Sequence, residues 1–129
     1  MPNTPSIMGL HFRYRLWIAE MNSHINIIRI FDDYIGELSS KKNVPAVKEG
    51  IDHFKKEFVS LRKEIDDLRH EMHLAKMTLA ADSKESSKAG TKSSSKLNHK
   101  ELSKRYSDYR KNFERIKKEF GQFEAKWLK

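Results

Sequence analysis

Three side chains near the middle of the chain have the type and spacing of a surface metal site. His70 and His73 are three residues apart in the run RHEMH, and Asp66 precedes His70 by four residues. In an α-helix such positions share one face, so Asp66, His70 and His73 are the candidate ligands for a divalent ion. HEMH lacks the H-E-x-x-H spacing of zinc proteases. We therefore favour the alternative, solvated histidines with no bound metal.

His24 is a second candidate, because it interrupts an apolar stripe and Glu20 precedes it by one helical turn. A buried histidine must find a hydrogen-bond partner or lose its charge. Alignment of the predicted helices places the Tyr109 hydroxyl or Glu20 within reach of the ring. We predict a structural histidine that fixes the helix register, and we expect His24→Leu to leave the fold intact and to stabilise it.

No pattern in the chain indicates a catalytic site. A di-iron centre in a helical bundle needs several inward-facing Glu and Glu-x-x-His pairs, and here no Asp or Glu occupies an apolar seam. The sequence also lacks a phosphate-binding glycine loop, a nucleophile elbow and zinc-ligand spacing. We expect neither an enzyme nor a bound cofactor.

Three helices must position these residues, because apolar residues recur at alternating steps of four and three in three segments. The predicted helices cover about residues 9–39, 45–81 and 98–128. Their seams are Leu10, Tyr14, Trp17, Met21, His24, Ile28, Phe31, Ile35 and Leu38; Val47, Ile51, Phe54, Phe58, Leu61, Ile65, Leu68, Met72, Ala75 and Leu79; and Leu102, Tyr106, Tyr109, Phe113, Ile116, Phe120, Phe123 and Trp127.

The second seam has flanks of opposite charge. Such flanks indicate which neighbouring helix takes which side. The basic flank consists of Lys48, Lys55, Arg62, Arg69 and Lys76, and the acidic flank of Glu57, Glu64 and Glu71.

The connections between these segments predict the topology. The short stretch 39–45 makes the first two helices antiparallel neighbours, and the Ser- and Lys-rich stretch 82–97 has the composition of a flexible linker. We predict an all-α fold, an up-down-up bundle of three long amphipathic helices with coiled-coil-like heptad packing. Residues 9–129 form this single domain after a loose segment, 1–8.

The chain of 129 residues has no cysteine and a net charge of +8. Its last part, residues 98–129, carries ten Lys or Arg against five Asp or Glu, and Lys104, Lys111 and Lys118 form a basic surface opposite the third seam. Such a surface can attract nucleic acid or anionic lipid, or it can simply keep the protein soluble. The N-terminus lacks the pattern of a signal peptide and no apolar run is long enough to span a membrane, so we expect a cytoplasmic protein.

The first helix carries apolar residues beyond its seam. Leu16, Ile27, Ile30 and Tyr34 form a further strip, which we call the outer strip. A contiguous apolar strip in water is unusual for a monomer. We therefore predict that these four residues form an interaction surface. We also predict that the protein is a homodimer.

Three segments carry a resemblance: WIAE at 17–20, FVSLRKEIDDLRHEM at 58–72 and FERIKKEFGQFEAKWL at 113–128. The chain resembles a group of short uncharacterised bacterial all-helical proteins. The resemblance implies an all-helical protein with no assigned activity, and no functional residue follows from it.

Two functions remain open at this stage. The first is a helical interaction or scaffold protein that self-associates and binds an unidentified protein partner. The alternative is a weak, sequence-independent nucleic-acid or anionic-surface binder that uses the basic residues of the C-terminal third.

Overall fold

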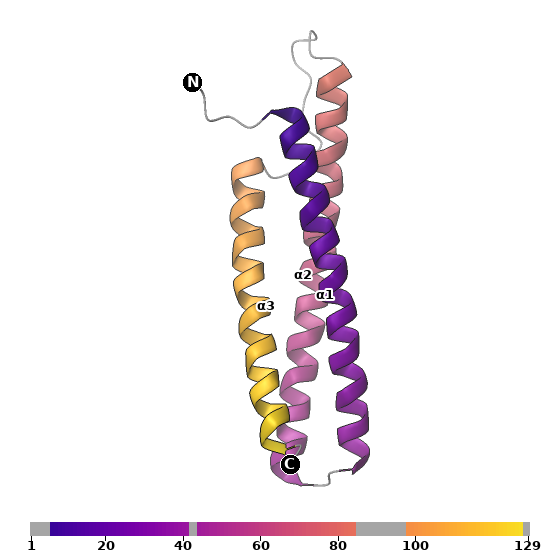
Figure 1. The fold of residues 1–129 in the computed structure, drawn as a ribbon, viewed down its shortest axis with the longest axis vertical. Helices are drawn as coiled ribbons and strands as arrows, with labels where there is room; N and C mark the ends of the chain where they lie inside the picture. Colours follow the sequence, from indigo (N-terminus) through magenta and orange to yellow (C-terminus); the bar gives the residue numbers. More distant parts are fainter. Residues whose placement is uncertain (1–5, 42–43, 85–97, 128–129) are drawn as a thin grey trace.

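A computed structural model describes residues 6–41, 44–84 and 98–127, with side chains of 80–84 excepted. The described residues form three helices, α1 (Ile7–Lys41), α2 (Pro45–Lys84) and α3 (His99–Trp127), and contain no β-strand. Figure 1 shows them side by side along the long axis, with α2 running opposite to α1 and α3. The predicted all-α, up-down-up bundle of three long helices is confirmed.

The helix ends differ from the predicted ones by a few residues. Helix α1 starts at Ile7 because the hydroxyl of Ser6 accepts a hydrogen bond from the backbone N–H of Gly9 at 3.0 Å, which is the geometry of an N-cap. Residues 7 and 8 are therefore helical and not part of a loose segment. Residues 1–5 lie outside the described residues.

Helix α2 continues to Lys84, so residues 82–84 of the predicted linker are helical. Helices commonly extend one or two residues past a sequence-based boundary, and the alanines at positions 80 and 81 favour continuation. The rest of the linker, 85–97, lies outside the described residues.

The starts of α2 and α3 follow their sequence signals. The Asn98 side chain accepts a bond from the backbone N–H of Glu101 at 2.8 Å, and the Glu101 carboxylate accepts one from the Asn98 N–H at 3.1 Å. This reciprocal pair is a capping box. Pro45 is the first residue of α2, where its missing N–H has no intrahelical partner to lose.

The three predicted seams form the core. Almost all seam residues are buried, while Leu10, Trp17, Phe31, Leu79, Phe123 and Trp127 are partly buried at its margins. Ile18, outside the predicted seam, is buried as well. The long heptads therefore identify the core correctly and underestimate how much of α1 it includes.

The charged flanks of α2 face the two neighbours as predicted. On the basic flank, Arg69 donates a hydrogen bond to Asn22 of α1 at 2.7 Å. On the acidic flank, Glu57 pairs with Arg115 of α3 at 3.4 Å. Each exposed contact contributes little to the free energy of unfolding alone. Together the contacts place α1 and α3 on opposite sides of α2.

Helices α1 and α3 are farther from each other than either is from α2. Both pack against α2, whereas no Cα atom of α1 lies within 8 Å of a Cα atom of α3 among the described residues. Figure 1 shows this separation along the bundle. Large side chains must therefore span the space between α1 and α3.

Gly50 has a packing reason that the sequence does not reveal. A Cβ atom at this position of α2 would overlap the Phe123 ring of α3. Glycine in a helix costs roughly 1 kcal/mol relative to alanine, and here the missing side chain admits an aromatic ring.

Candidate functional site

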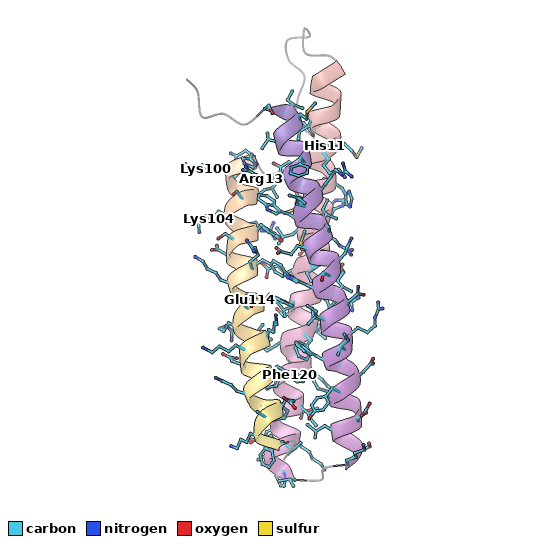
Figure 2. All side chains as sticks on the ribbon, viewed as in Figure 1. His11, Arg13, Lys100, Lys104, Glu114 and Phe120 are labelled. Carbon is cyan, nitrogen blue, oxygen red and sulfur yellow. The ribbon has the colours of Figure 1, made fainter. Side chains whose placement is uncertain are left out.

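The space between α1 and α3 is crossed by a series of aromatic and polar side chains. At its upper end in Figure 2, near Arg13 and Lys100, the Tyr14 hydroxyl shares a 2.9 Å hydrogen bond with Nδ1 of His99. Trp17 stacks on His99 with ring centroids 6.2 Å apart and on Tyr106 at 4.8 Å. The heptad pattern does not single out His99, because it is only the first residue of α3.

One turn further along, Glu20 joins two residues of α3. The Tyr106 hydroxyl donates a hydrogen bond to the Glu20 carboxylate, and Nε of Arg110 lies 3.0 Å from the same group. Burial, followed by the hydrogen bond and charge of Glu20, raises the pKa of Tyr106 far above its usual value. Glu20 therefore anchors α3, and it is not the partner of His24.

His24 occupies the centre of the series. It is 7% exposed, its Nδ1 lies 2.6 Å from the Tyr109 hydroxyl, and its ring stacks on Phe113 with centroids 3.7 Å apart. The predicted pairing with Tyr109 is confirmed. The ring is therefore enclosed in the bundle and packed against α3.

The pKa of His24 lies below its usual value. Burial is the main cause, because it disfavours the charged ring. The nearby carboxylates of Glu20 and Glu114 oppose this shift, while Arg110 and Lys117 add to it. The surroundings of His24 therefore favour the neutral ring over the charged one.

Beyond His24 the space opens into a groove. A cavity of about 470 Å³ lies between Ile30 and Tyr34 of α1 and Phe120 and Gly121 of α3. Tyr34 meets Phe120 edge to face with ring centroids 6.0 Å apart, and its buried hydroxyl has no hydrogen-bond partner among the described residues. A Cβ atom at Gly121 would have nothing within 4 Å. The cavity is therefore open and mostly apolar.

The outer strip reaches this groove at Ile30 and Tyr34. Leu16 is 53% exposed and Ile30 is 64% exposed, whereas Ile27 and Tyr34 are partly buried against the core. Two of the four predicted interaction residues are therefore exposed, and two of them, Ile30 and Tyr34, line the cavity.

The predicted metal ligands on α2 do not come together as a group. The Asp66 carboxylate pairs with Arg69 at 2.9 Å, and His70 and His73 are exposed. Burial, followed by the charges of Lys76 and Arg69, lowers the pKa of His73. Binding of a metal by Asp66, His70 and His73 stays a prediction without geometric support.

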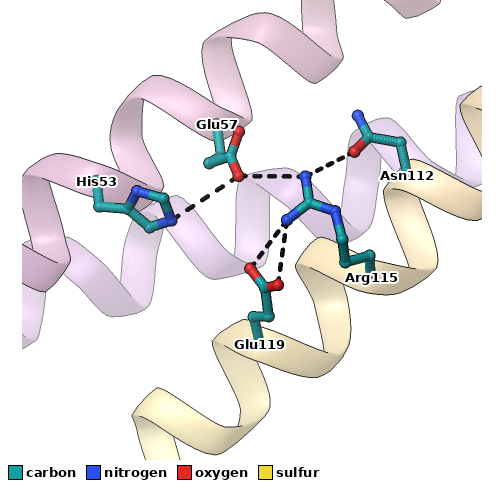
Figure 3. A network of polar contacts seen from close by, with 5 residues as sticks. All are labelled: His53, Glu57, Asn112, Arg115 and Glu119. Carbon is teal, nitrogen blue, oxygen red and sulfur yellow. Dashed lines mark hydrogen bonds and ion pairs between the residues drawn. The ribbon is translucent and has the colours of Figure 1, made fainter.

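A different group has ligand atoms within 4.8 Å of one another: His53, Glu57 and Glu119, the one such group in the described ranges. Figure 3 shows that Arg115 already lies between the two carboxylates. Its guanidinium lies 3.1 Å from Glu119 and 3.4 Å from Glu57, and it donates to Asn112 at 2.7 Å. Because Arg115 pairs with both carboxylates, we interpret the group as an ion-pair network between α2 and α3.

The predicted basic surface faces solvent. Lys104, Lys111 and Lys118 are exposed on α3, and Lys104 pairs with Asp108 at 3.3 Å. The seam aromatics of α3 point into the bundle, so they are not available to stack on nucleic-acid bases.

The chain matches no family model, no curated protein and no solved structure. The resemblance to short bacterial helical proteins therefore stays a prediction. In the part of the chain that the structure describes, no helix is long and apolar enough to cross a bilayer.

The contact between His24 and Tyr109 reverses the expected effect of His24→Leu. Removing the imidazole leaves the Tyr109 hydroxyl buried without a partner, which costs about 1–3 kcal/mol. We expect His24→Leu to lower the free energy of unfolding, and we expect His24→Leu/Tyr109→Phe to recover most of the loss. Urea unfolding of both variants measures this difference, and a stable single variant would show that the hydrogen bond contributes nothing.

The burial of His24 beside Tyr109 also predicts how the stability of the fold depends on pH. Because the pKa of His24 is lower in the folded state than in the unfolded state, the unfolded chain binds more protons as the pH falls below about 6.5. We expect the free energy of unfolding to decrease as the pH is lowered from roughly 7.5 to roughly 5.5. His73 and His99 contribute with the same sign.

The variant His24→Leu/Tyr109→Phe is the control for this pH dependence, because it keeps the other histidines. Its free energy of unfolding should decrease less over the same range. Equal decreases in the variant and the wild type would show that His24 does not titrate as its burial indicates.

Proposed function

We propose that this protein is a non-enzymatic helical interaction or scaffold protein that self-associates through the outer strip and the adjoining groove. The observation that supports the proposal is the exposed apolar surface of α1, with Leu16 and Ile30 more than half exposed beside an open cavity. The residues of the space between α1 and α3 are engaged with one another, which favours recognition over catalysis.

A second copy of the chain is the simplest partner for this surface. Contiguous exposed apolar strips mark interaction sites in soluble proteins, and two-fold pairing of one surface with itself is the commonest assembly. A stable contact requires about 1,200 Å² or more of buried surface in total. Leu16 and Ile30 lie 14 residues apart, roughly 21 Å along α1, so a contact that covers both would extend over much of the helix.

Replacement of Ile30 by lysine tests the proposal. Lysine would replace an exposed apolar side chain of the contact by a charged one, so Ile30→Lys should convert the homodimer to a folded monomer. Val59→Lys is the matched control, because Val59 is similarly exposed, at 70%, on α2. Light scattering after size-exclusion chromatography gives the mass, and circular dichroism confirms that both variants are helical.

Two outcomes would contradict this assignment. If both variants stay dimeric, the interface lies elsewhere, and the exposed residues Met8, Phe12 and Met77 near one end of the bundle would be next to test. If Val59→Lys dissociates the dimer and Ile30→Lys does not, α2 carries the contact.

The basic surface supports an alternative, the weak binding of nucleic acid or of another anionic surface. Lys111 and Lys118 are exposed without seam aromatics beside them, so phosphate attraction would act alone. Such binding is independent of sequence and weakens steeply with salt, because each contacted phosphate releases bound counterion.

A salt titration distinguishes the alternative from the proposal. We expect fluorescence anisotropy to detect binding to a labelled DNA duplex at low salt and none at physiological salt, since a few lysines neutralise few phosphates. Lys111→Glu/Lys118→Glu should remove the low-salt binding and leave the dimer unchanged. Tight binding that persists at physiological salt would favour the nucleic-acid function.

A further inference from the structure

Helix α1 carries a second heptad stripe, which includes the outer strip and is partly exposed. Its members follow one another at alternating steps of three and four, the spacing of a helix–helix contact. Four of them are apolar or aromatic, and charged residues occupy both ends. The stripe consists of Arg13, Leu16, Glu20, Ser23, Ile27, Ile30, Tyr34 and Glu37.

Helix α1 carries charges of opposite sign near the two ends of this stripe. On α1, Arg13 is near the N-terminal end of the helix and Glu37 near the C-terminal end, and both are exposed. On α3, Lys100 and Glu124 have the same order. Figure 2 shows Arg13 and Lys100 at the same end of the molecule. Arg13 and Glu37 therefore give the stripe on α1 a basic end and an acidic end.

We infer that two copies of the chain pair antiparallel through this stripe, with the two-fold axis close to residue 25 of α1. The inference rests on the proposed self-association and specifies its geometry. In this register Arg13 of one copy meets Glu37 of the other, and Leu16 meets Tyr34. Ser23 and Ile27 lie on either side of the axis.

Charge selects the antiparallel arrangement. A parallel pair would place Arg13 beside Arg13 and Glu37 beside Glu37, and facing like charges oppose association. The antiparallel pair instead brings two Arg13–Glu37 contacts into each dimer. Lys41, one turn beyond Glu37, meets Gly9 of the second copy and therefore no like charge.

The same register gives the cavity an occupant. Leu16 of the second copy faces Tyr34, whose side chain forms part of the wall of the 470 Å³ cavity. Gly121 leaves the opposite wall open for an approaching helix. Ile30 faces Glu20 of the second copy, whose charge Arg110 already neutralises. Each half of the dimer thus inserts one leucine into the groove of the other.

Disulfide trapping tests the register, and the chain is suited to it because it contains no cysteine. Leu16→Cys and Tyr34→Cys are prepared separately and mixed in equal amounts under mild oxidation. In the antiparallel register, position 16 of one copy lies about 18 residues along the helix axis from position 16 of the other, which is roughly 27 Å. A disulfide requires Cα atoms within about 7 Å.

We therefore expect the mixture to form a disulfide dimer that contains one of each variant, and neither variant alone to form one. Mass spectrometry distinguishes the mixed dimer from the others. Efficient linking of Leu16→Cys to itself would indicate a parallel pair and overturn the inference. If no variant links while the unmodified protein sediments as a dimer, the register is wrong and self-association stands. If the unmodified protein is a monomer, the proposed function itself fails.

Charge exchange gives a second readout without cysteine. Arg13→Glu and Glu37→Arg should each weaken the dimer about tenfold, since each replaces two attractive contacts by two repulsive ones. The combined variant should regain most of the affinity. Arg15→Glu, at an exposed position outside the stripe, is the control and should have little effect. If only net charge mattered, Arg13→Glu and Arg15→Glu would have equal effects, because each lowers the charge of +8 by two, and Glu37→Arg would have the opposite effect. That outcome would overturn the register.

Discussion

The bulk of the side chains between α1 and α3 is the constraint on which the rest of the structure depends. Stacked rings such as Trp17 on Tyr106 and His24 on Phe113 fill the space between the two helices. Because large side chains occupy this space, the backbones of α1 and α3 stay apart while both pack on α2. The groove, its cavity and the partly exposed wall of α1 all follow from that spacing.

A separation of this kind needs polar contacts to define the register of the two helices. Tyr14 with His99, Glu20 with Arg110, and His24 with Tyr109 connect α1 to α3 at three places along the bundle. Apolar rings alone can slide along one another, whereas a buried hydrogen bond is lost when the register shifts. The polar groups between α1 and α3 therefore fix the register of the two helices. This also explains why a histidine occupies a position in an apolar seam.

The sequence predicts which residues are inside better than it predicts how far apart the helices lie. Alternating steps of four and three identify the buried seams and the contact between His24 and Tyr109, because both depend only on position along each helix. The distance between α1 and α3 depends on how rings from different helices stack, and no single-helix pattern contains that information. For the same reason the sequence does not predict the group of His53, Glu57 and Glu119, because its members come from two different helices, α2 and α3.

The central claim is that the open side of α1 is covered by a second copy of the chain. Sedimentation equilibrium of the unmodified protein at tens of micromolar tests it most directly, because the method measures mass without a variant or a label. The account predicts twice the mass of one chain, with dissociation only on dilution. A single-chain mass throughout that concentration range would contradict it.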